Sequence, residues 1–217
     1  MTPDLAAERM DYAKEPLLES NVPTEPFELF DDWLSQAFAA KQDGLLPEPT
    51  AMVVATSEKG RPSARTVLLK QADRDGFVFF TNYLSSKGAE LAFNPFVALH
   101  FGWYPLERQV RIEGTAARVP RAQSEAYFAT RPRGSQVGAW ASAQSSMVEG
   151  RDTLMDHFRA AEERFAGQDV PCPPHWGGYC VTPDRMEFWQ GQPSRMHDRL
   201  VYRLQTNGDW TLDRLAP

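Results

Sequence analysis

The segment from Phe188 to Arg199 holds the densest set of side chains that could bind an anion. It reads Phe-Trp-Gln-Gly-Gln-Pro-Ser-Arg-Met-His-Asp-Arg. If residues 195–199 are extended, the two-residue period of a strand places Arg195, His197 and Arg199 on one face. Such a row suits phosphate, because the planar guanidinium group of arginine matches a phosphate group. The alternative is an exposed edge strand, whose charges deter pairing with other chains.

Two further cationic groups occur in the first half of the chain. Arg65 and Lys70 are five residues apart, so a regular strand points them to opposite faces. Both can serve one ligand only if it wraps the strand end; otherwise they project into solvent. Ser85, Ser86 and Lys87 precede an expected helix, where backbone N–H groups and the helix dipole favour an anion. A plain capping serine explains the same pattern.

Another candidate phosphate-binding group lies in the middle of the chain, and the histidines differ in their surroundings. Arg131 and Ser135 bracket a Pro/Gly turn just after Tyr127, and together they could grip a second phosphate. His100 lies in an apolar strand, which indicates a hydrogen-bonded core histidine. Among the four histidines, only His197 stands within a row of cations.

The elements that must position these residues follow from periodicity and turn signals. Residues 1–24 are polar and contain prolines, so we expect an arm, and we expect one domain over residues 25–217. The expected helices cover residues 26–42, 85–93, 121–130 and 150–165. The expected strands cover residues 51–56, 63–70, 77–81, 96–103, 108–118, 179–182, 185–189, 199–205 and 210–215. Short strands joined by tight turns predict an antiparallel barrel decorated by helices, a mainly β fold of the α+β class.

Composition narrows the possible functions. The chain of 217 residues carries a net charge of −6, which argues against nucleic acid or an anionic membrane as a partner. Its two cysteines, Cys172 and Cys180, have no metal-binding spacing and fit a reducing compartment. No run is long and apolar enough to span a membrane, so we expect a cytoplasmic protein without a metal. Because the chain lacks dinucleotide, Walker and nucleophile-elbow motifs, any phosphate must be held mostly by side chains.

Taken together, the order and spacing of several motifs resemble the pyridoxine (pyridoxamine) 5′-phosphate oxidase family. The resemblance runs from about Arg9 to Pro217, and each motif alone is weak. The motifs are Arg65-Thr-Val-Leu-Leu-Lys70, Ser85-Ser-Lys87, Glu107-Arg-Gln-Val110, Tyr127-Phe-Ala-Thr-Arg-Pro-Arg-Gly-Ser135, Gln144-Ser-Ser146, Trp176-Gly-Gly178, Phe188-Trp-Gln-Gly191, Arg195-Met-His-Asp-Arg199 and Asp213-Arg-Leu-Ala-Pro217.

The resemblance implies an FMN-binding split β-barrel that forms a homodimer with FMN at the subunit interface. The residues that it assigns to FMN are Arg65, Thr66, Val67, Leu68, Leu69, Lys70, Phe80, Thr81, Ser86, Lys87, Gln109, Gln144, Ser145, Trp189 and Arg199. The residues that it assigns to the substrate are Arg9, Tyr12, Lys70, Tyr127, Arg131, Ser135, Arg195 and His197, of which Arg195 and His197 are the expected catalytic pair. Arg9 and Tyr12 resemble the N-terminal flap of the family.

Two positions depart from the family pattern. Ser86 stands where many members carry arginine next to the lysine, which puts one phosphate contact in question. Phe80 replaces a frequent tyrosine and keeps the ring without the hydroxyl group.

The expected activity is the oxidation of pyridoxamine or pyridoxine 5′-phosphate to pyridoxal 5′-phosphate. The resemblance implies hydride transfer from C4′ of the substrate to the flavin, with O2 as acceptor and hydrogen peroxide as product. One alternative is an FMN oxidase of the same barrel that acts on another aromatic metabolite, as in phenazine biosynthesis. Another is a protein that binds FMN or pyridoxal phosphate without turnover.

Overall fold

The computed structural model describes residues 11–217, which form nine strands and five α-helices. The α-helices are α1 (Pro26–Gln42), α2 (Ser86–Phe93), α3 (Arg121–Thr130), α4 (Arg133–Ala141) and α5 (Arg151–Arg164). The strands are β1 (Ala51–Glu58), β2 (Arg61–Leu68), β3 (Gln71–Asp73), β4 (Gly76–Asn82), β5 (Phe96–Trp103), β6 (Arg108–Arg118), β7 (Trp176–Gln190), β8 (Asp198–Leu204) and β9 (Trp210–Arg214). Three 3-10 turns complete the elements: η1 (Glu19–Asn21), η2 (Tyr104–Leu106) and η3 (Pro193–Arg195).

The nine strands belong to one sheet. Seven of them follow the order β2-β1-β5-β6-β7-β4-β3, and β8 pairs with both β7 and β9. The β3–β4, β4–β7, β7–β8 and β8–β9 pairs are all antiparallel. The prediction of an antiparallel fold of the α+β class is therefore confirmed.

Within the described residues, the chain divides into two compact units. Unit 1 comprises residues 11–52, Leu99–Glu113 and Pro183–Pro217. Unit 2 comprises Val53–Ala98 and Gly114–Thr182. No helix in residues 11–217 combines the length and the apolar character needed to cross a membrane.

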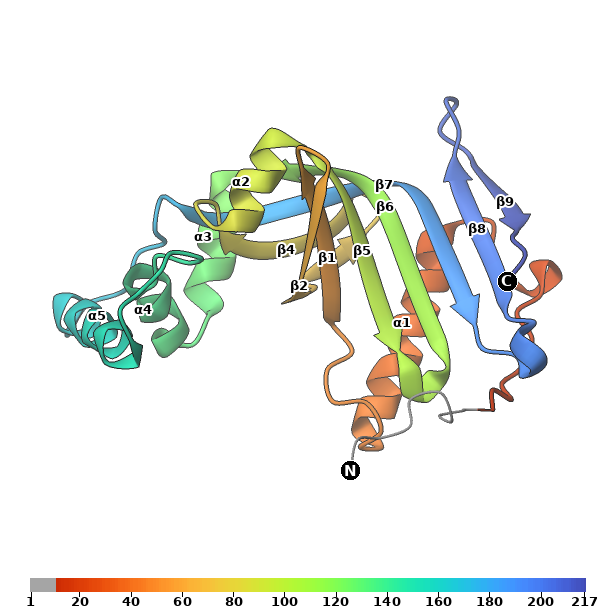
Figure 1. Cartoon of the computed structure of the whole chain (residues 1–217), viewed down its shortest axis with the longest axis horizontal. Helices are drawn as coiled ribbons and strands as arrows, with labels where there is room; N and C mark the ends of the chain where they lie inside the picture. The colour runs from red at the N-terminus through yellow and green to blue at the C-terminus, as the bar shows by residue number, and fades with distance from the viewer. Residues whose placement is uncertain (1–10) are drawn as a thin grey trace. The chain divides into compact units, whose positions relative to one another are not determined.

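Unit 1 is built around α1, which lies on strands of the sheet (Figure 1). Pro26 occupies the start of the helix, where its missing N–H group is not needed. The ring centres of Phe30 and Phe101 of β5 are 5.2 Å apart, and those of Trp33 and Phe188 of β7 are 5.3 Å apart. These buried aromatic rings pack α1 against β5 and β7, so the apolar face of the predicted helix is part of the core.

Unit 2 has a second apolar core beneath its helices, where α4 and α5 lie side by side (Figure 1). The core residues are Phe128, Val137, Ala161, Phe165, Val170 and Trp176. Helix α4 was not predicted, because Pro132 reads as a break in the sequence. Pro132 in fact takes the cap position just before α4, where a proline does not interrupt the helix.

The connection after β7 contradicts one prediction. Residues 195–199 do not form one extended strand, because Ser194 and Arg195 have positive φ angles of 57° and 61°. Pro193 to Arg195 make the turn η3, and β8 begins only at Asp198. The two-residue period therefore does not hold across this segment, and Arg195 does not share a strand face with Arg199.

Candidate functional site

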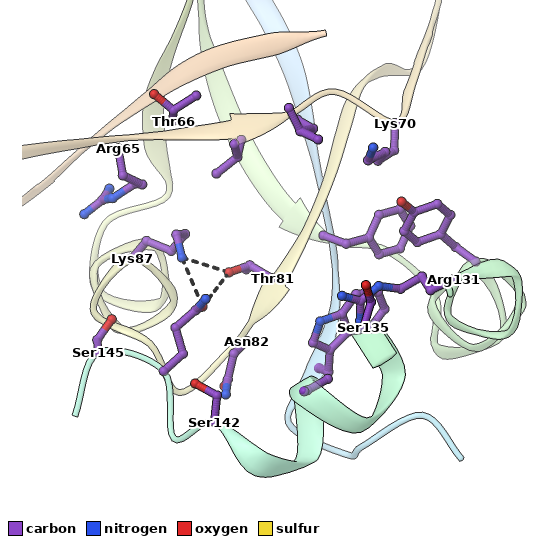
Figure 2. Close-up of a pocket in the computed structure, with 18 of the residues that line it drawn as sticks. Arg65, Thr66, Lys70, Thr81, Asn82, Lys87, Arg131, Ser135, Ser142 and Ser145 are labelled. Carbon is purple, nitrogen blue, oxygen red and sulfur yellow. Dashed lines mark hydrogen bonds between the residues drawn. The ribbon is translucent and has the colours of Figure 1, made fainter. Parts of the chain in front are cut away.

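Unit 2 contains a cavity of about 740 Å³ (Figure 2). Its wall is made by the end of β2, by β4, by the start of α2, by α3 and α4, by the segment that follows α4 and by the start of β7. The lining residues are Arg65, Thr66, Val67, Leu68, Lys70, Phe80, Thr81, Asn82, Ser86, Lys87, Tyr127, Arg131, Ser135, Gly138, Ala139, Ser142, Gln144, Ser145 and Trp176.

The lining of this cavity is strongly cationic. It includes two arginines and two lysines, and none of its described lining residues is Asp or Glu. Figure 2 shows these cations in two groups, with Arg65 and Lys87 on one side and Lys70 and Arg131 on the other. A concave surface with positive charge and no carboxylate attracts anions. The cavity therefore suits a ligand with two anionic ends, or two anionic ligands.

Arg65 and Lys70 line the same cavity although five residues separate them. Strand β2 ends at Leu68, so the chain no longer alternates between faces when it reaches Lys70. The backbone N–H of Lys70 then donates to the carbonyl oxygen of Val78 at 2.8 Å. Leu69 is buried and does not line the cavity. Arg65 and Lys70 can therefore both face one ligand in this cavity, although they do not share a strand face.

The guanidinium group of Arg65 is held by a network of hydrogen bonds. Its Nη2 lies 2.7 Å from a carboxylate oxygen of Glu90 and 2.5 Å from Ser63 Oγ. Thr56 and Ser63 also donate to Glu90. Burial alone would raise the pKa of Glu90, but the hydrogen bonds from Thr56, Ser63 and Arg65 outweigh it and lower that pKa. Arg65 is thus an oriented and charge-compensated arginine.

Lys87 differs from Arg65, because its ammonium group has only neutral partners within the described residues. Its Nζ donates to Thr81 Oγ1 at 3.0 Å, to Gln144 Oε1 at 3.2 Å and to Ser85 Oγ at 3.4 Å (Figure 2 draws the first two). The residue is only 9% exposed. Burial, followed by repulsion from Arg65, lowers the pKa of Lys87, and attraction to Glu90 offsets this only in part. A buried ammonium group that is hydrogen-bonded to no carboxylate gains most from an anionic ligand.

The N-termini of two helices border the cavity. Ser85 caps α2, since its Oγ accepts from the N–H of Gly88 at 3.4 Å, and Ser86 follows at the cavity wall. Ser135 lies in the first turn of α4. Both ends contribute the positive pole of a helix dipole. The capping interpretation of Ser85 and the anion-binding interpretation of its neighbours are therefore both compatible with the structure.

Arg131 forms the second cationic group with Lys70. Its guanidinium carbon lies 4.7 Å above the ring of Trp176, and its Nη1 is buried without a hydrogen-bond partner in the described part of the chain. Burial lowers the pKa of Arg131, although an arginine remains charged at any working pH. Buried polar atoms are normally satisfied, so an unpartnered one that borders a cavity points to a missing ligand.

Unit 1 contains a smaller cavity of about 220 Å³. Its lining residues are His100, Gln109, Arg111, Glu187, Trp189, His197, Arg199 and Pro217. Three of them, Gln109, Trp189 and Arg199, are predicted FMN ligands, and His197 is a predicted substrate ligand. His100 was predicted to be a hydrogen-bonded core histidine. It is hydrogen-bonded, with His100 Nε2 and Gln109 Oε1 3.1 Å apart, but it is only half-buried.

Glu187 organises the charges of this second cavity. The carboxylate contacts Arg111, Arg185 and Arg199, the last two at 2.6 and 2.8 Å. Burial alone would raise the pKa of Glu187, but hydrogen bonds from Arg199 and Arg185 lower it. One buried carboxylate thus orients several arginines, and Arg199 is among them.

The turn η3 separates the expected catalytic pair. His197 lines the cavity of unit 1 and lies 4.7 Å from the ring of Trp189, while Arg195 is exposed and does not line it. The Nδ1 atom of His197 accepts from the backbone N–H of Gln192 at 3.0 Å. This bond leaves Nε2 as the ring atom that can face a ligand. Of the predicted row, only His197 and Arg199 come together.

The N-terminal arm is attached to the same region of unit 1. The ring of Tyr12 meets Trp189 edge-on at 5.6 Å and His197 at 5.2 Å. A Cβ atom at Gly191 would lie 2.4 Å from the Tyr12 ring, so this close approach requires glycine. The backbone N–H of Ala13 donates to Glu107. Tyr12 therefore lies beside His197, a predicted substrate residue, and Trp189, a predicted FMN residue. Arg9, the other predicted residue of the arm, lies outside the described residues.

The structure gathers most predicted site residues into these two cavities. In unit 2 the predicted residues that line one cavity are Arg65, Thr66, Val67, Leu68, Lys70, Phe80, Thr81, Ser86, Lys87, Tyr127, Arg131, Ser135, Gln144 and Ser145. The lining residues that sequence reasoning missed are Asn82, Gly138, Ala139, Ser142 and Trp176. The motif Trp176-Gly-Gly178 is a signal for Trp176, since it belongs to the motifs that carry the family resemblance.

Comparisons with known proteins agree with this arrangement. The family model described as "Pyridoxamine 5'-phosphate oxidase" matches residues 38–165, and the model described as "Pyridoxine 5'-phosphate oxidase C-terminal dimerisation region" matches residues 176–217. Pyridoxine/pyridoxamine 5′-phosphate oxidases from Salinispora arenicola and Pseudomonas fluorescens strain Pf0-1 are 54% and 51% identical to the chain. These matches cover 96% and 100% of the chain and 94% and 100% of the relatives.

Solved structures show the same fold. PhzG from Burkholderia lata 383, solved with tetrahydrophenazine-1-carboxylic acid, has a TM-score of 0.85 at 30% identity and covers 93% of this chain and 98% of its own. A pyridoxamine 5′-phosphate oxidase-related, FMN binding protein from Nostoc punctiforme has a TM-score of 0.66 at 15% identity, covering 84% and 96%. The split-barrel fold is thereby confirmed. The chain, matched along nearly its whole length, belongs to the pyridoxamine 5′-phosphate oxidase family.

Proposed function

We propose that this protein oxidises pyridoxamine 5′-phosphate, pyridoxine 5′-phosphate or both to pyridoxal 5′-phosphate, with FMN as cofactor. The observation that carries the proposal is the cavity of unit 2, which has cations in two groups and no carboxylate among its described lining residues. A reaction between a flavin phosphate and a phosphorylated substrate needs two such groups. Relatives about 50% identical over the full chain carry the name of this activity.

The residues present fit a bound FMN. The donor set of Arg65, Ser86 and Lys87 is suited to phosphate, and Lys87 in particular has no hydrogen-bonded carboxylate within the described residues. Thr81 and Gln144 hydrogen-bond to the ammonium group of Lys87 and so fix where its charge lies. When bound, FMN supplies the two-electron redox chemistry, and O2 is the final acceptor with hydrogen peroxide as product.

The second group fits the phosphate of the substrate. Lys70, Tyr127, Arg131 and Ser135 line the same cavity and offer two cations and two hydroxyl groups. Arg131 also has an unpartnered buried nitrogen for an incoming oxygen. These side chains bind and orient the ester, so that the reacting carbon is held in one position rather than activated by a nucleophile.

We also propose that the active form is a homodimer in which each flavin contacts both protomers. The support is the match of residues 176–217 to a family model described as a dimerisation region. In this proposal the flavin contacts Gln109, Trp189 and Arg199, and the substrate contacts His197. Arg195 keeps its proposed substrate role only if it acts from the exposed turn η3.

The test is a direct measurement of flavin reduction. Purified protein should be yellow, and pyridoxamine 5′-phosphate added under argon should bleach the flavin absorbance. Admission of air should restore the colour and release hydrogen peroxide. A holoprotein that binds the ester but is not bleached would support the binding-protein alternative. A holoprotein bleached by a reduced phenazine carboxylate and not by the ester would support the activity class of the 30% identical relative.

A further inference from the structure

Three aromatic rings form a nearly parallel group at the wall of the unit 2 cavity. Phe80 of β4 stacks on Tyr127 of α3 with ring centres 4.1 Å apart and planes 21° apart. Phe80 also stacks on Trp176 at the start of β7, at 5.4 Å and 11°. Tyr127 and Trp176 are 6.2 Å apart with planes within 10°. We call these residues the aromatic platform.

The platform carries the guanidinium group of Arg131. The guanidinium carbon lies 4.7 Å from the Trp176 ring centre and 5.5 Å from that of Phe128. Tryptophan is the aromatic residue that attracts a cation most strongly, and the attraction is larger at a buried site. No carboxylate forms an ion pair with Arg131 in residues 11–217, and its Nη1 is unpartnered there. Trp176 is therefore the main feature that orients this arginine.

Arg131 is held by an aromatic ring, whereas Arg65 is held by a carboxylate. Glu90 binds the edge of the Arg65 guanidinium and compensates its charge. An aromatic ring instead contacts the face of a guanidinium group and leaves the N–H edge open. Arg131 can therefore offer its donors and its full charge to an anion. Because Arg131 is a proposed ligand of the substrate phosphate, the platform bears on substrate choice.

We propose that Trp176, held in place by Phe80, is the positioning residue that sets the preference of this enzyme for phosphorylated substrates. The inference rests on the proposed function, since it takes Arg131 as a substrate-phosphate ligand. It extends the site to Trp176. It also gives the Phe80 ring a role at the substrate phosphate, whereas the sequence resemblance placed Phe80 with the flavin.

A purely structural role for Trp176 makes a different prediction. Trp176 is 6% exposed and belongs to the apolar core of unit 2, as Phe165 does. If Trp176 only fills this core, replacing it lowers the free energy of unfolding without changing phosphate binding selectively. Phe165 does not line the cavity, so Phe165→Leu is a matched control for loss of core packing.

The experiment compares Trp176→Phe, Trp176→Leu and Phe80→Leu with wild type and with Phe165→Leu. Inorganic phosphate and unphosphorylated pyridoxamine are used as competitive inhibitors of pyridoxamine 5′-phosphate oxidation. We expect the inhibition constant of phosphate and the KM of the ester to rise about threefold in Trp176→Phe. In Trp176→Leu both should rise at least about tenfold, which corresponds to about 1.4 kcal/mol. In Trp176→Phe and Trp176→Leu, the inhibition constant of pyridoxamine, kcat and flavin content should stay within about twofold. In Phe80→Leu, the inhibition constant of phosphate should rise more than that of pyridoxamine.

Several outcomes would overturn the inference. One is a phosphate inhibition constant that changes no more in Trp176→Leu than in Phe165→Leu. Another is an equal loss for phosphate and for pyridoxamine, or an effect of Phe80→Leu on flavin content alone. If Trp176→Leu does not fold, Trp176→Phe and Phe80→Leu still decide between the two roles.

Failure of the proposed function would be distinguishable from failure of this inference. If wild type oxidises no phosphorylated ester, the proposed activity is wrong. Equilibrium dialysis of radiolabelled inorganic phosphate against FMN-saturated wild type and Trp176 variants would then still measure whether the platform supports an anion site, because the flavin phosphate would occupy the group of Arg65 and Lys87. Phosphate binding that is unaffected by Trp176→Leu in that assay would reject the platform independently of activity.

Discussion

At the scale of single residues, the cavity of unit 2 contains two cations that the fold does not neutralise. Lys87 hydrogen-bonds only to neutral oxygens, and Arg131 rests on an aromatic ring. Burying a cation in this way costs free energy of folding, which an anionic ligand can recover. The binding residues are thus expected to destabilise the flavin-free protein, as is common for functional sites.

Replacement of Lys87 by methionine tests this trade-off. Thr81 Oγ1 already donates to Gln144 Oε1 at 3.2 Å, so the two partners remain hydrogen-bonded to each other. We expect flavin binding to be lost while the Tm of the flavin-free protein rises, by roughly 2–4 °C per 1 kcal/mol. Calorimetry of flavin-free protein and a flavin titration measure the two effects. A lower Tm in the variant would show that Lys87 stabilises the empty cavity.

The stability difference should also depend on pH in one direction. The folded-state pKa of Lys87 is lowered, chiefly by burial, so its cost is fully present when pH lies below that value. The advantage of Lys87→Met should therefore shrink as pH rises through the lowered pKa towards the ordinary lysine pKa. An advantage that grows with pH over this interval would contradict the assignment.

Ser86→Arg tests the departure from the family pattern. Ser86 lines the cavity next to Lys87 at the start of α2. A charge-assisted hydrogen bond to phosphate contributes about 1.5–3 kcal/mol, so FMN affinity should rise about ten- to a hundredfold. The added cation near Arg65 and Lys87 should lower the Tm of the flavin-free protein. Unchanged or weaker FMN binding in a fluorescence titration would mean that existing cations already fill this position.

At the scale of elements, periodicity predicted whatever depended on local pattern alone. The bounds of α1, α3, β5 and β6 agree residue for residue with the expected ranges. The structure replaces the two strands expected at residues 179–182 and 185–189 with one strand, β7, which runs through Pro183. On this edge, β7 pairs with β4 up to Val181 and with β8 from Arg185, so Pro183 falls where neither pairing needs its N–H.

The site was less predictable where tertiary contacts set the backbone. Ser194 and Arg195 have positive φ angles, a conformation that usually signals glycine in a sequence. Because neither residue is glycine, the sequence predicted a regular strand with Arg195, His197 and Arg199 on one face. Trp176 was missed because its partners, Phe80 and Arg131, are distant in sequence. Motif order identified the cavity, but only packing shows which side chains hold one another in place.

The turn between β7 and β8 yields a prediction about His197 and Arg199. In His197→Asn the amide oxygen can accept the bond from Gln192 N–H, so the turn and FMN should be retained. We expect kcat/KM to fall at least about tenfold, or roughly 1.4 kcal/mol of transition-state stabilisation. Arg199→Met should instead lose flavin. A colourless His197→Asn together with a yellow, active Arg199→Met would reverse the two assignments.

Gly191 offers a separate test of the N-terminal arm. In Gly191→Ala the new Cβ would lie 2.4 Å from the ring of Tyr12, so the arm must move away from Trp189 and His197. We expect a higher KM for the ester with little change in flavin content. Tyr12→Ala should produce a similar KM, and the double variant should add nothing further. Fully additive effects would show that Gly191 acts on something other than Tyr12.

At the scale of the whole molecule, the predicted ligands fall into two sets in different units. Unit 2 contains Lys87 with most of the proposed phosphate ligands, and unit 1 contains Arg199 with Trp189 and Gln109. The C-terminal segment that includes Trp189 and Arg199 matches the family's dimerisation region. A homodimer with two shared sites accounts for both facts, because a two-fold axis generates two equal copies of any shared site.

Subunit mixing can decide whether each flavin site is shared. Lys87→Met and Arg199→Met should each lose flavin as homodimers. If each site takes Lys87 from one protomer and Arg199 from the other, a mixed dimer has one site with both defects and one intact site. Equal co-expression should then give about a quarter of wild-type flavin and activity, since about half of the dimers are mixed.

Differently tagged chains allow the mixed dimer to be purified, and it should hold about one FMN per dimer. If both residues served the same site from one chain, every site would keep one defect. Mixed dimers would then stay colourless, which would exclude the shared site even if sedimentation shows a stable dimer.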